Sequence, residues 1–179
     1  MDGTESRRQR ARGELAKHGR LIRSSRDGRL LSAAMAPLFR LRTPRGYGIL
    51  TTTGRRSGQP RPKCVRVLRE GRCAYLVALM PPHITVERPD AVNAWVHNVR
   101  ADPRVSLKLP DGSHTGVARE ITDPTELATA RNLLCDTVVG LDFGECAAHL
   151  RGIPSRAKIR DLHAYWFDTG RAVAVDLID

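Results

Sequence analysis

The stretch from Thr51 to Lys63, TTTGRRSGQPRPK, combines the residue types that bind anions. Gly54 and Gly58 free the backbone to turn and to present amide N–H groups toward an anion, and Ser57 adds a hydroxyl donor. No acidic residue interrupts the stretch, and its cationic side chains are Arg55, Arg56, Arg61 and Lys63. Because a guanidinium binds phosphate or carboxylate through two parallel hydrogen bonds, this composition predicts an anion-binding loop.

The positive charge of the chain is concentrated in its first third. The 179 residues carry a formal net charge of +11; residues 1–63 hold 16 Lys or Arg against 4 Asp or Glu, whereas residues 64–179 hold 14 against 15. Such asymmetry indicates contact with an anionic partner: nucleic acid, a membrane surface or a phosphorylated ligand. Specific reading of nucleic acid lacks support, because no helix-turn-helix or zinc-finger pattern accompanies the charge. A solvated basic loop and an arginine-rich solubilising tail are the alternatives that need no ligand.

Other kinds of chemistry have weaker support. The four cysteines show no C-x-x-C spacing and no close histidine, so we expect reduced, mostly buried thiols and no metal site. No apolar run approaches the roughly 18 residues of a membrane span. The arginine-rich N-terminus lacks the apolar core of a secretion signal. We therefore expect a cytoplasmic protein, with peripheral membrane contact through the basic N-terminal segment left open.

The beginning of the chain is predicted to differ from the rest. Residues 1–29 read as a basic tail, flexible or partly helical, and residues 30–179 as a single domain. At the start of that domain, residues 30–41 place apolar side chains near a helical period, and Pro37 implies a kink or a late helix start. A basic amphipathic helix of this kind either packs on its own domain or lies on a membrane surface.

Short strands joined by turns are predicted for most of the domain. A strand at residues 47–53 leads into the basic loop, and an almost wholly apolar run at residues 74–80 is typical of a central strand covered on both faces. Hairpins are predicted at residues 64–80, 104–121 and 162–177, turning at Glu70–Gly71, at Pro110–Gly112 and at Thr169–Gly170.

Helices are predicted between these strands. One spans residues 90–102 with Asp90 as its N-cap, and another spans residues 122–139 with Thr122 or Asp123 as its cap. Residues 141–158 are expected to be irregular or a broken helix. About six strands in hairpins, with inserted and flanking helices, indicate an α+β protein built around a small antiparallel β-barrel.

The order of residues in the loop adds a resemblance to a known family. Leu50–Arg61, LTTTGRRSGQPR, resembles the signature loop of the deazaflavin (F420)-dependent nitroreductase family. Ala94–Leu107, AWVHNVRADPRVSL, and Val117–Glu126, VAREITDPTE, are similar to further segments of that family at matching distances. The resemblance covers about residues 45–130 of the chain.

This resemblance implies a split β-barrel of the FMN-binding, pyridoxamine-phosphate-oxidase-like and flavin-reductase-like kind. It also implies coenzyme F420 as cofactor, an 8-hydroxy-5-deazaflavin with a phosphate and an oligoglutamate tail. The implied activity is that of an oxidoreductase that transfers a hydride from reduced F420 to a quinone, a nitroaromatic or an activated alkene. The residues implied to bind the cofactor are Arg55, Arg56, Ser57, Arg61, Lys63, Ala78, Leu79, Met80, Trp95 and Asn98.

The segment ALMPPH, residues 78–83, departs from the family, which has a polar segment with two glycines there. Pro81 and Pro82 remove amide N–H donors there. An apolar segment of this kind also suits a non-enzymatic binding protein for a lipid, a haem or another apolar ligand. An FMN-dependent oxidoreductase on the same barrel is the second alternative. No catalytic residue is assigned, because Tyr47, Tyr75, Tyr165 and Trp166 are each expected to be structural.

Overall fold

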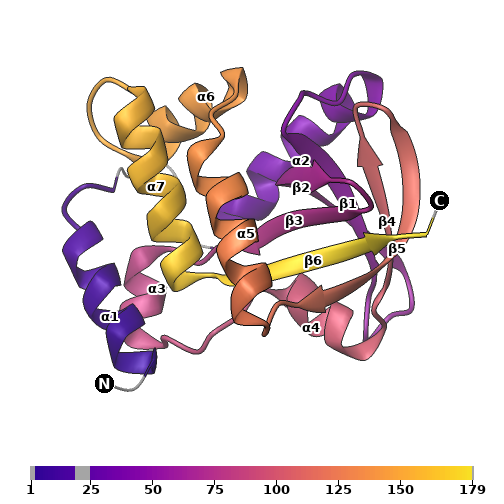
Figure 1. Cartoon of the computed structure of the whole chain (residues 1–179), viewed down its shortest axis with the longest axis horizontal. Coiled ribbons are helices and arrows are strands. Elements are labelled where there is room, and N and C mark those ends of the chain that lie inside the picture. The colour runs from indigo at the N-terminus through magenta and orange to yellow at the C-terminus, as the bar shows by residue number, and fades with distance from the viewer. Residues whose placement is uncertain (1–2, 19–24, 179) are drawn as a thin grey trace.

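The architecture is a closed antiparallel barrel flanked by helices (Figure 1). It is seen in a computed structural model that describes residues 3–18 and 25–178. Around the barrel the strands follow the order β1-β2-β3-β6-β5-β4, and β4 pairs with β1 to close it. The strands of the described residues are β1 (Tyr47–Thr53), β2 (Pro60–Glu70), β3 (Cys73–Ala78), β4 (Arg104–Leu109), β5 (Gly112–Glu120) and β6 (Arg171–Leu177). The predicted α+β antiparallel barrel is thereby confirmed.

Two of the three predicted hairpins are confirmed. β2 and β3 are joined by a turn in which Gly71 has φ +57°, and β4 and β5 by a turn at Pro110–Asp111. β3 is a central strand covered on both faces, as its apolar run predicts. Leu76 faces the barrel core, whereas Tyr75 packs outside with Leu134 of helix α5 (Pro124–Asp136).

The third predicted hairpin is wrong. Residues Arg156–Thr169 form helix α7, and β6 follows it and inserts between β3 and β5. The aromatic residues of this segment suggest a strand, but its buried residues recur three and four positions apart. They are Ile159, Leu162, His163, Tyr165, Trp166 and Thr169. This helical spacing buries one face of α7, and the Ser155 hydroxyl caps the helix by accepting a hydrogen bond from the Lys158 amide.

The remaining helices of the domain are α3 (Pro82–Glu87), α4 (Ala94–Ala101) and α6 (Gly140–His149). The predicted cap at Asp90 is wrong: α4 begins after Asn93, and Asp90 pairs with Arg7 and Arg171 instead. The Asp123 cap of α5 is confirmed, since its carboxylate accepts from the Glu126 amide at 2.7 Å. Residues 141–158 contain most of α6 and the start of α7, so the expected broken helix is confirmed.

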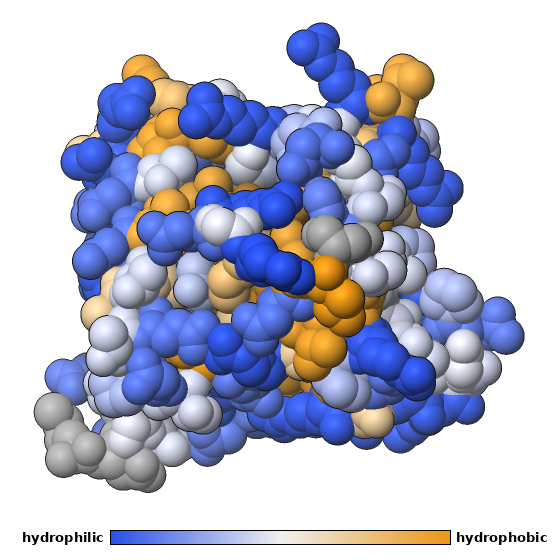
Figure 2. Space-filling view, turned by 45° about the vertical axis from the view of Figure 1, so that its right-hand side comes forward, coloured by the Kyte–Doolittle hydropathy of each residue, from blue (hydrophilic) through white to orange (hydrophobic). Residues whose placement is uncertain are grey.

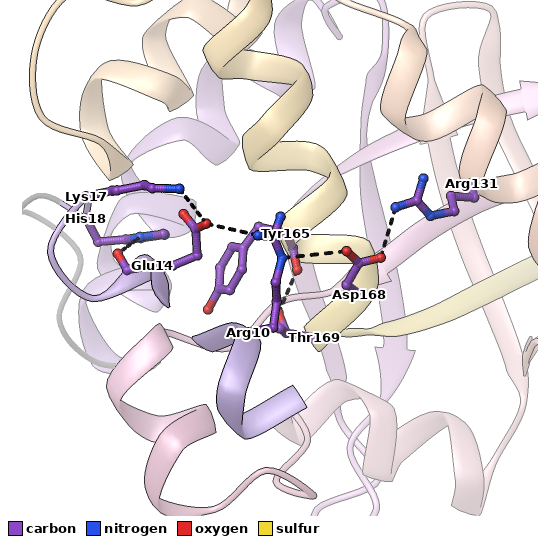
Figure 3. A network of polar contacts seen from close by, with 8 residues as sticks. All are labelled: Arg10, Glu14, Lys17, His18, Arg131, Tyr165, Asp168 and Thr169. Atoms are coloured by element: carbon purple, nitrogen blue, oxygen red, sulfur yellow. Dashed lines mark hydrogen bonds and ion pairs between the residues drawn. The ribbon is translucent and has the colours of Figure 1, made fainter. Parts of the chain in front are cut away.

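Helix α1 (Gly3–Glu14) lies beside α3 and α7, at the end of the molecule opposite the C-terminus (Figure 1). Asp168 of α7 lies between Arg10 of α1 and Arg131 of α5, with N–O distances of 3.7 and 3.1 Å (Figure 3). Ala11 is fully buried in the cluster that includes Tyr165. α1 therefore packs on the helical end of the domain, and the division of the chain after residue 29 stays a prediction.

Helix α2 (Ser25–Leu41) packs against β1 and β2. Met35 and Phe39 pack against Tyr47 and Ile49, and Pro37 lies inside the helix. On the described residues, no helix is both long and apolar enough to cross a membrane. Hydrophilic side chains cover most of the face shown in Figure 2, and apolar groups interrupt it in a few places. Among the cysteines, Cys135 and Cys146 are buried, and all four are free thiols.

Candidate cofactor-binding loop

The predicted anion-binding loop connects β1 to β2 at residues 54–59, and it is an ordered turn. The amides of Ser57 and Gly58 both donate to the Gly54 carbonyl, at 3.1 and 2.7 Å, and the Gly54 amide donates to the Gln59 carbonyl at 2.9 Å. These three N–H groups hydrogen-bond within the turn, so they are not presented toward an anion. An anion at this loop would therefore be bound by the side chains and by the backbone amide of Arg56, which takes no part in the hydrogen bonds of the turn.

Both glycines are needed for the shape of this turn. Gly58 has φ +65°, a region that other residues adopt at a cost. At Gly54 an added Cβ would lie 2.8 Å from the Ser57 hydroxyl and 3.2 Å from Nε of Arg61. Glycine at position 54 thus lets Ser57 and Arg61 approach each other, and an Arg61 N–H donates to the Ser57 hydroxyl at 3.1 Å.

Asn98 of α4 holds the start of the loop. Its side-chain carbonyl accepts from the Arg55 amide at 3.2 Å, and its amide group donates to the Thr52 hydroxyl at 3.0 Å. Asn98 and Thr52 are both buried. An unsatisfied buried polar group costs about 1–3 kcal/mol, so this pair of bonds fixes the loop to α4. Contact of Asn98 with the cofactor stays a prediction; in the structure its side chain positions Arg55.

Two of the cationic side chains, those of Arg61 and Lys63, lie on one face of the β1–β2 hairpin. Opposite residues of an antiparallel pair project to the same face. Thr52 is opposite Arg61 and Leu50 is opposite Lys63, so these two cations lie on the face that carries the buried Leu50 and Thr52. Residues 60–66 of β2 pair with β1, and β3 pairs only with residues 67–70. Within the described chain, the half of β2 nearest the loop therefore has a strand on one side only.

The loop arginines are not neutralised by the protein itself. Arg55, Arg56 and Arg61 are exposed, and in the described part of the chain none of them forms an ion pair with a carboxylate. Asp102, which follows α4, is already paired with Arg104 at 3.0 Å, and that hydrogen bond holds the pKa of the Asp102 carboxyl below its usual value. Uncompensated guanidinium groups on an ordered turn fit a ligand with a phosphate and several carboxylates.

The structure does not bring the side chains of the second predicted segment to the loop. Ala78 is buried in the barrel core, Leu79 packs on the cluster of α1, α6 and α7, and Met80 is half-buried. Pro81 precedes α3 and Pro82 is its first residue, a position that suits proline because the missing N–H would have no helical partner. Contacts of residues 78–80 with a cofactor stay a prediction, and Ala78 could make them through its backbone alone.

Trp95, the other residue of α4 predicted to bind cofactor, lies in the barrel core. It is 6% exposed and clusters with Leu50, Val96 and Val105. Burying an aromatic side chain of this size contributes roughly 3 kcal/mol to the stability of the fold. Trp95 therefore fixes α4 to the barrel core. Its position supports the loop indirectly, because Asn98 lies one turn further along the same helix.

A largely buried polar cluster was not predicted from the sequence. Tyr47, Arg66, Asp142 and Glu145 meet beneath α6, with His163 of α7 beside them. The partners are 76 to 98 residues apart in sequence, and only the i, i+3 spacing of Asp142 and Glu145 is a local signal. Two surface clefts of about 660 and 310 Å3 lie elsewhere, the larger between residues 41–45 and the β4–β5 turn, and neither includes a predicted cofactor-binding residue.

The fold and the loop define a class: a barrel protein with a cationic loop suited to a phosphorylated cofactor. Residues 40–145 match the family described as F420H(2)-dependent quinone reductase, so the chain belongs to this family. It is an enzyme, an F420-dependent reductase whose cofactor is coenzyme F420. The resemblance found in the sequence is thereby confirmed. No curated protein matches the chain in sequence.

Several solved structures are similar to the chain. An F420-H2 dependent reductase (FDR-A) is 20% identical, with 73% of this chain and 94% of that one covered and a TM-score of 0.48. The conserved hypothetical protein Rv2991 from Mycobacterium tuberculosis is 18% identical over 89% and 83%, also with a TM-score of 0.48. A Clostridium acetobutylicum protein of the pyridoxinephosphate oxidase family is 10% identical over 81% and 82%, with a TM-score of 0.44.

Proposed function

We propose that the chain transfers a hydride from reduced F420 to an electrophilic organic acceptor, with quinones as the preferred class over nitroaromatics and activated alkenes. The hydride chemistry is supplied by the bound deazaflavin. Arg55, Arg56, Ser57, Arg61 and Lys63 would hold the phosphate and the glutamate tail. The observation that carries this assignment is the set of loop arginines, which have no carboxylate partner among the described residues, on a turn fixed by Asn98.

The protein's own residues position the cofactor in this proposal. The Asn98 side chain orders Arg55 before any ligand arrives, which lowers the entropy lost on binding. Trp95 fills the barrel beneath α4 and excludes water from that side. Residues 78–80 at the end of β3 are the proposed neighbours of the ring, through backbone groups. No residue of the chain is proposed as a proton donor.

The acceptor class is tested with reduced F420 and three acceptors, a short-chain quinone, a nitroaromatic and an enone. We expect the largest kcat/KM with the quinone. The visible absorption that F420 regains as its reduced form is oxidised provides the readout, and a reaction without enzyme provides the control. If F420 binds but no acceptor is reduced faster than in that control, the acceptor proposal is wrong and the cofactor assignment is unaffected.

We also propose that α2 contacts an anionic membrane surface. Leu30, Leu31, Leu38 and Leu41 are 63, 46, 61 and 88% exposed. At 100° per residue these leucines span about 100° of the helix, beside the face on which Met35 and Phe39 pack on the barrel. The exposed Arg26, Arg40, Arg42 and Arg45 have no carboxylate ion pair within the described residues. An apolar stripe beside uncompensated cations suits an interfacial helix on anionic lipid.

Leu38→Glu combined with Leu41→Glu is expected to abolish cosedimentation with vesicles that contain anionic phosphatidylglycerol. The two carboxylates would have to enter the lipid interface and would also repel the anionic headgroups. Ile153→Glu with Ile178→Glu is the matched control, since both isoleucines are exposed elsewhere. Equal sedimentation of both double variants would show that α2 is not the contact. Equal binding of the unmodified protein to neutral and anionic vesicles would show that the surface need not be anionic.

A further inference from the structure

The hydroxyl of Tyr47 lies between two carboxyl groups of α6. Its oxygen is 2.7 Å from Oδ1 of Asp142 and 2.8 Å from Oε2 of Glu145. A phenol has one proton and can donate to only one of them. Both distances are hydrogen-bonding distances, so a second proton must lie on one of the two carboxyl groups.

Asp142 is the carboxyl group that has donors enough to stay ionised. Its Oδ1 accepts from Nε of Arg66 at 3.1 Å, and its Oδ2 accepts from the Val139 amide at 2.8 Å. Burial on its own would raise the pKa of Asp142, but the Arg66 charge and these hydrogen bonds hold it below its usual value. The Tyr47 hydroxyl therefore donates to Asp142.

Glu145 has no equivalent partners among the described residues. Arg66 already donates to Asp142 and, at 2.7 Å, to the Thr137 carbonyl. Burial raises the pKa of Glu145 to about 7, and the neighbouring Asp142 charge adds to the rise. A protonated Glu145 would donate to the Tyr47 oxygen, which completes a chain of two hydrogen bonds from Glu145 through Tyr47 to Asp142.

The other ionisable groups around the cluster do not supply the missing proton. His163 of α7 lies 3.9 Å from Asp142, and burial lowers its pKa to about 4, so it is neutral near pH 7. Burial raises the pKa of Tyr47 above its usual range and also raises the pKa of the Cys135 thiol on α5. On the side of helix α2, the apolar side chains of Phe39 and Met35 pack against Tyr47. Arg66 of β2 is the one cation that these contacts bring to the cluster in the described chain.

We propose that a proton on Glu145 fastens α6 to the barrel, so that the attachment weakens as the pH rises through neutrality. Loss of the proton would leave two carboxylates on one hydroxyl with a single guanidinium between them. Since the pKa of Glu145 is raised in the folded state, its contribution to stability is fully present below the unfolded-state value of 4.5 and is lost as the pH rises through about 7.

Glu145→Gln tests this inference, because the amide keeps the shape of a protonated carboxyl and cannot ionise. Between about pH 5 and about pH 9, the melting temperature of the wild type is expected to fall by roughly 5 °C more than that of Glu145→Gln. The exposed Glu87→Gln on α3 is the matched control and should follow the wild type. Equal pH dependence in wild type and Glu145→Gln would overturn the inference.

A second measurement does not depend on the folding of a variant. Infrared titration of the wild type should show the C=O band of a buried protonated carboxyl near neutral pH, and that band should disappear as the pH rises. A 13C NMR titration of labelled glutamates shows whether this band belongs to a glutamate. We expect one glutamate side chain to titrate near pH 7 and the others near their usual values. If all the glutamates titrate at their usual values, Glu145 carries no proton at neutral pH and the inference is wrong.

Discussion

Replacing Arg55 and Arg56 together with alanine is expected to weaken F420 binding about 100-fold, since each charge-assisted hydrogen bond lost costs about 1.5 kcal/mol or more. The folded structure should be unaffected, because both side chains are exposed and form no ion pair in the described chain. Fluorescence titration of F420 measures the effect. The affinity of the wild type should also fall with salt, as for any polyanion held by exposed cations.

The matched control removes the same charge elsewhere. Arg156→Ala with Arg160→Ala changes two exposed arginines of α7, away from the β1–β2 hairpin. This variant should bind F420 within about twofold of the wild type, because charges beyond a Debye length of about 8–10 Å are largely screened. If both double variants lose affinity equally, the loop does not hold the tail and only the overall positive charge attracts it.

Asp142→Asn is expected to lower the free energy of unfolding by about 3 kcal/mol at neutral pH. The Asp142 side chain is fully buried and that of Arg66 is 9% exposed, so the variant removes the carboxylate that pairs with a largely buried guanidinium. Urea unfolding measures the change. Asp136→Asn at the exposed end of α5 is the control, with an expected change below about 0.5 kcal/mol.

Arg66→Met added to Asp142→Asn separates the buried charge from the shape of the site. The double variant should be more stable than Asp142→Asn alone, because no unpaired charge remains. A double variant that is less stable than either single one would mean that Arg66 acts chiefly through its bond to the Thr137 carbonyl.

The sequence predicted the loop and most of the barrel because both leave local signals. Gly54 and Gly58 mark the turn, and the β4–β5 hairpin has alternating strands on either side of Pro110–Gly112. The error at residues 156–169 has a local cause as well. Aromatic residues near Thr169–Gly170 favour a hairpin, and the helical spacing from Ile159 to Trp166 outweighs them once it packs on α1 and α6.

Other features depend on contacts between distant residues. The role of Asn98 requires Thr52 and Arg55 to lie beside α4, 46 and 43 residues away in sequence. The proton shared around Tyr47 requires Glu145, 98 residues away. No pattern within a single segment encodes such pairs, so the sequence pointed to the cations of the loop and named Asn98, but it could not give the contacts that hold the loop and the barrel in place.

The dependence of the loop on Asn98 has a consequence for biosynthesis. All the loop cations have been synthesised once the ribosome reaches residue 63, but the helix that fixes Arg55 begins at residue 94 and the strand that closes the barrel on β1 ends at residue 109. A nascent chain shorter than this carries the charges without the ordered turn. Cofactor capture should therefore begin late in translation, and F420 should not serve as a template on which the first hairpin folds.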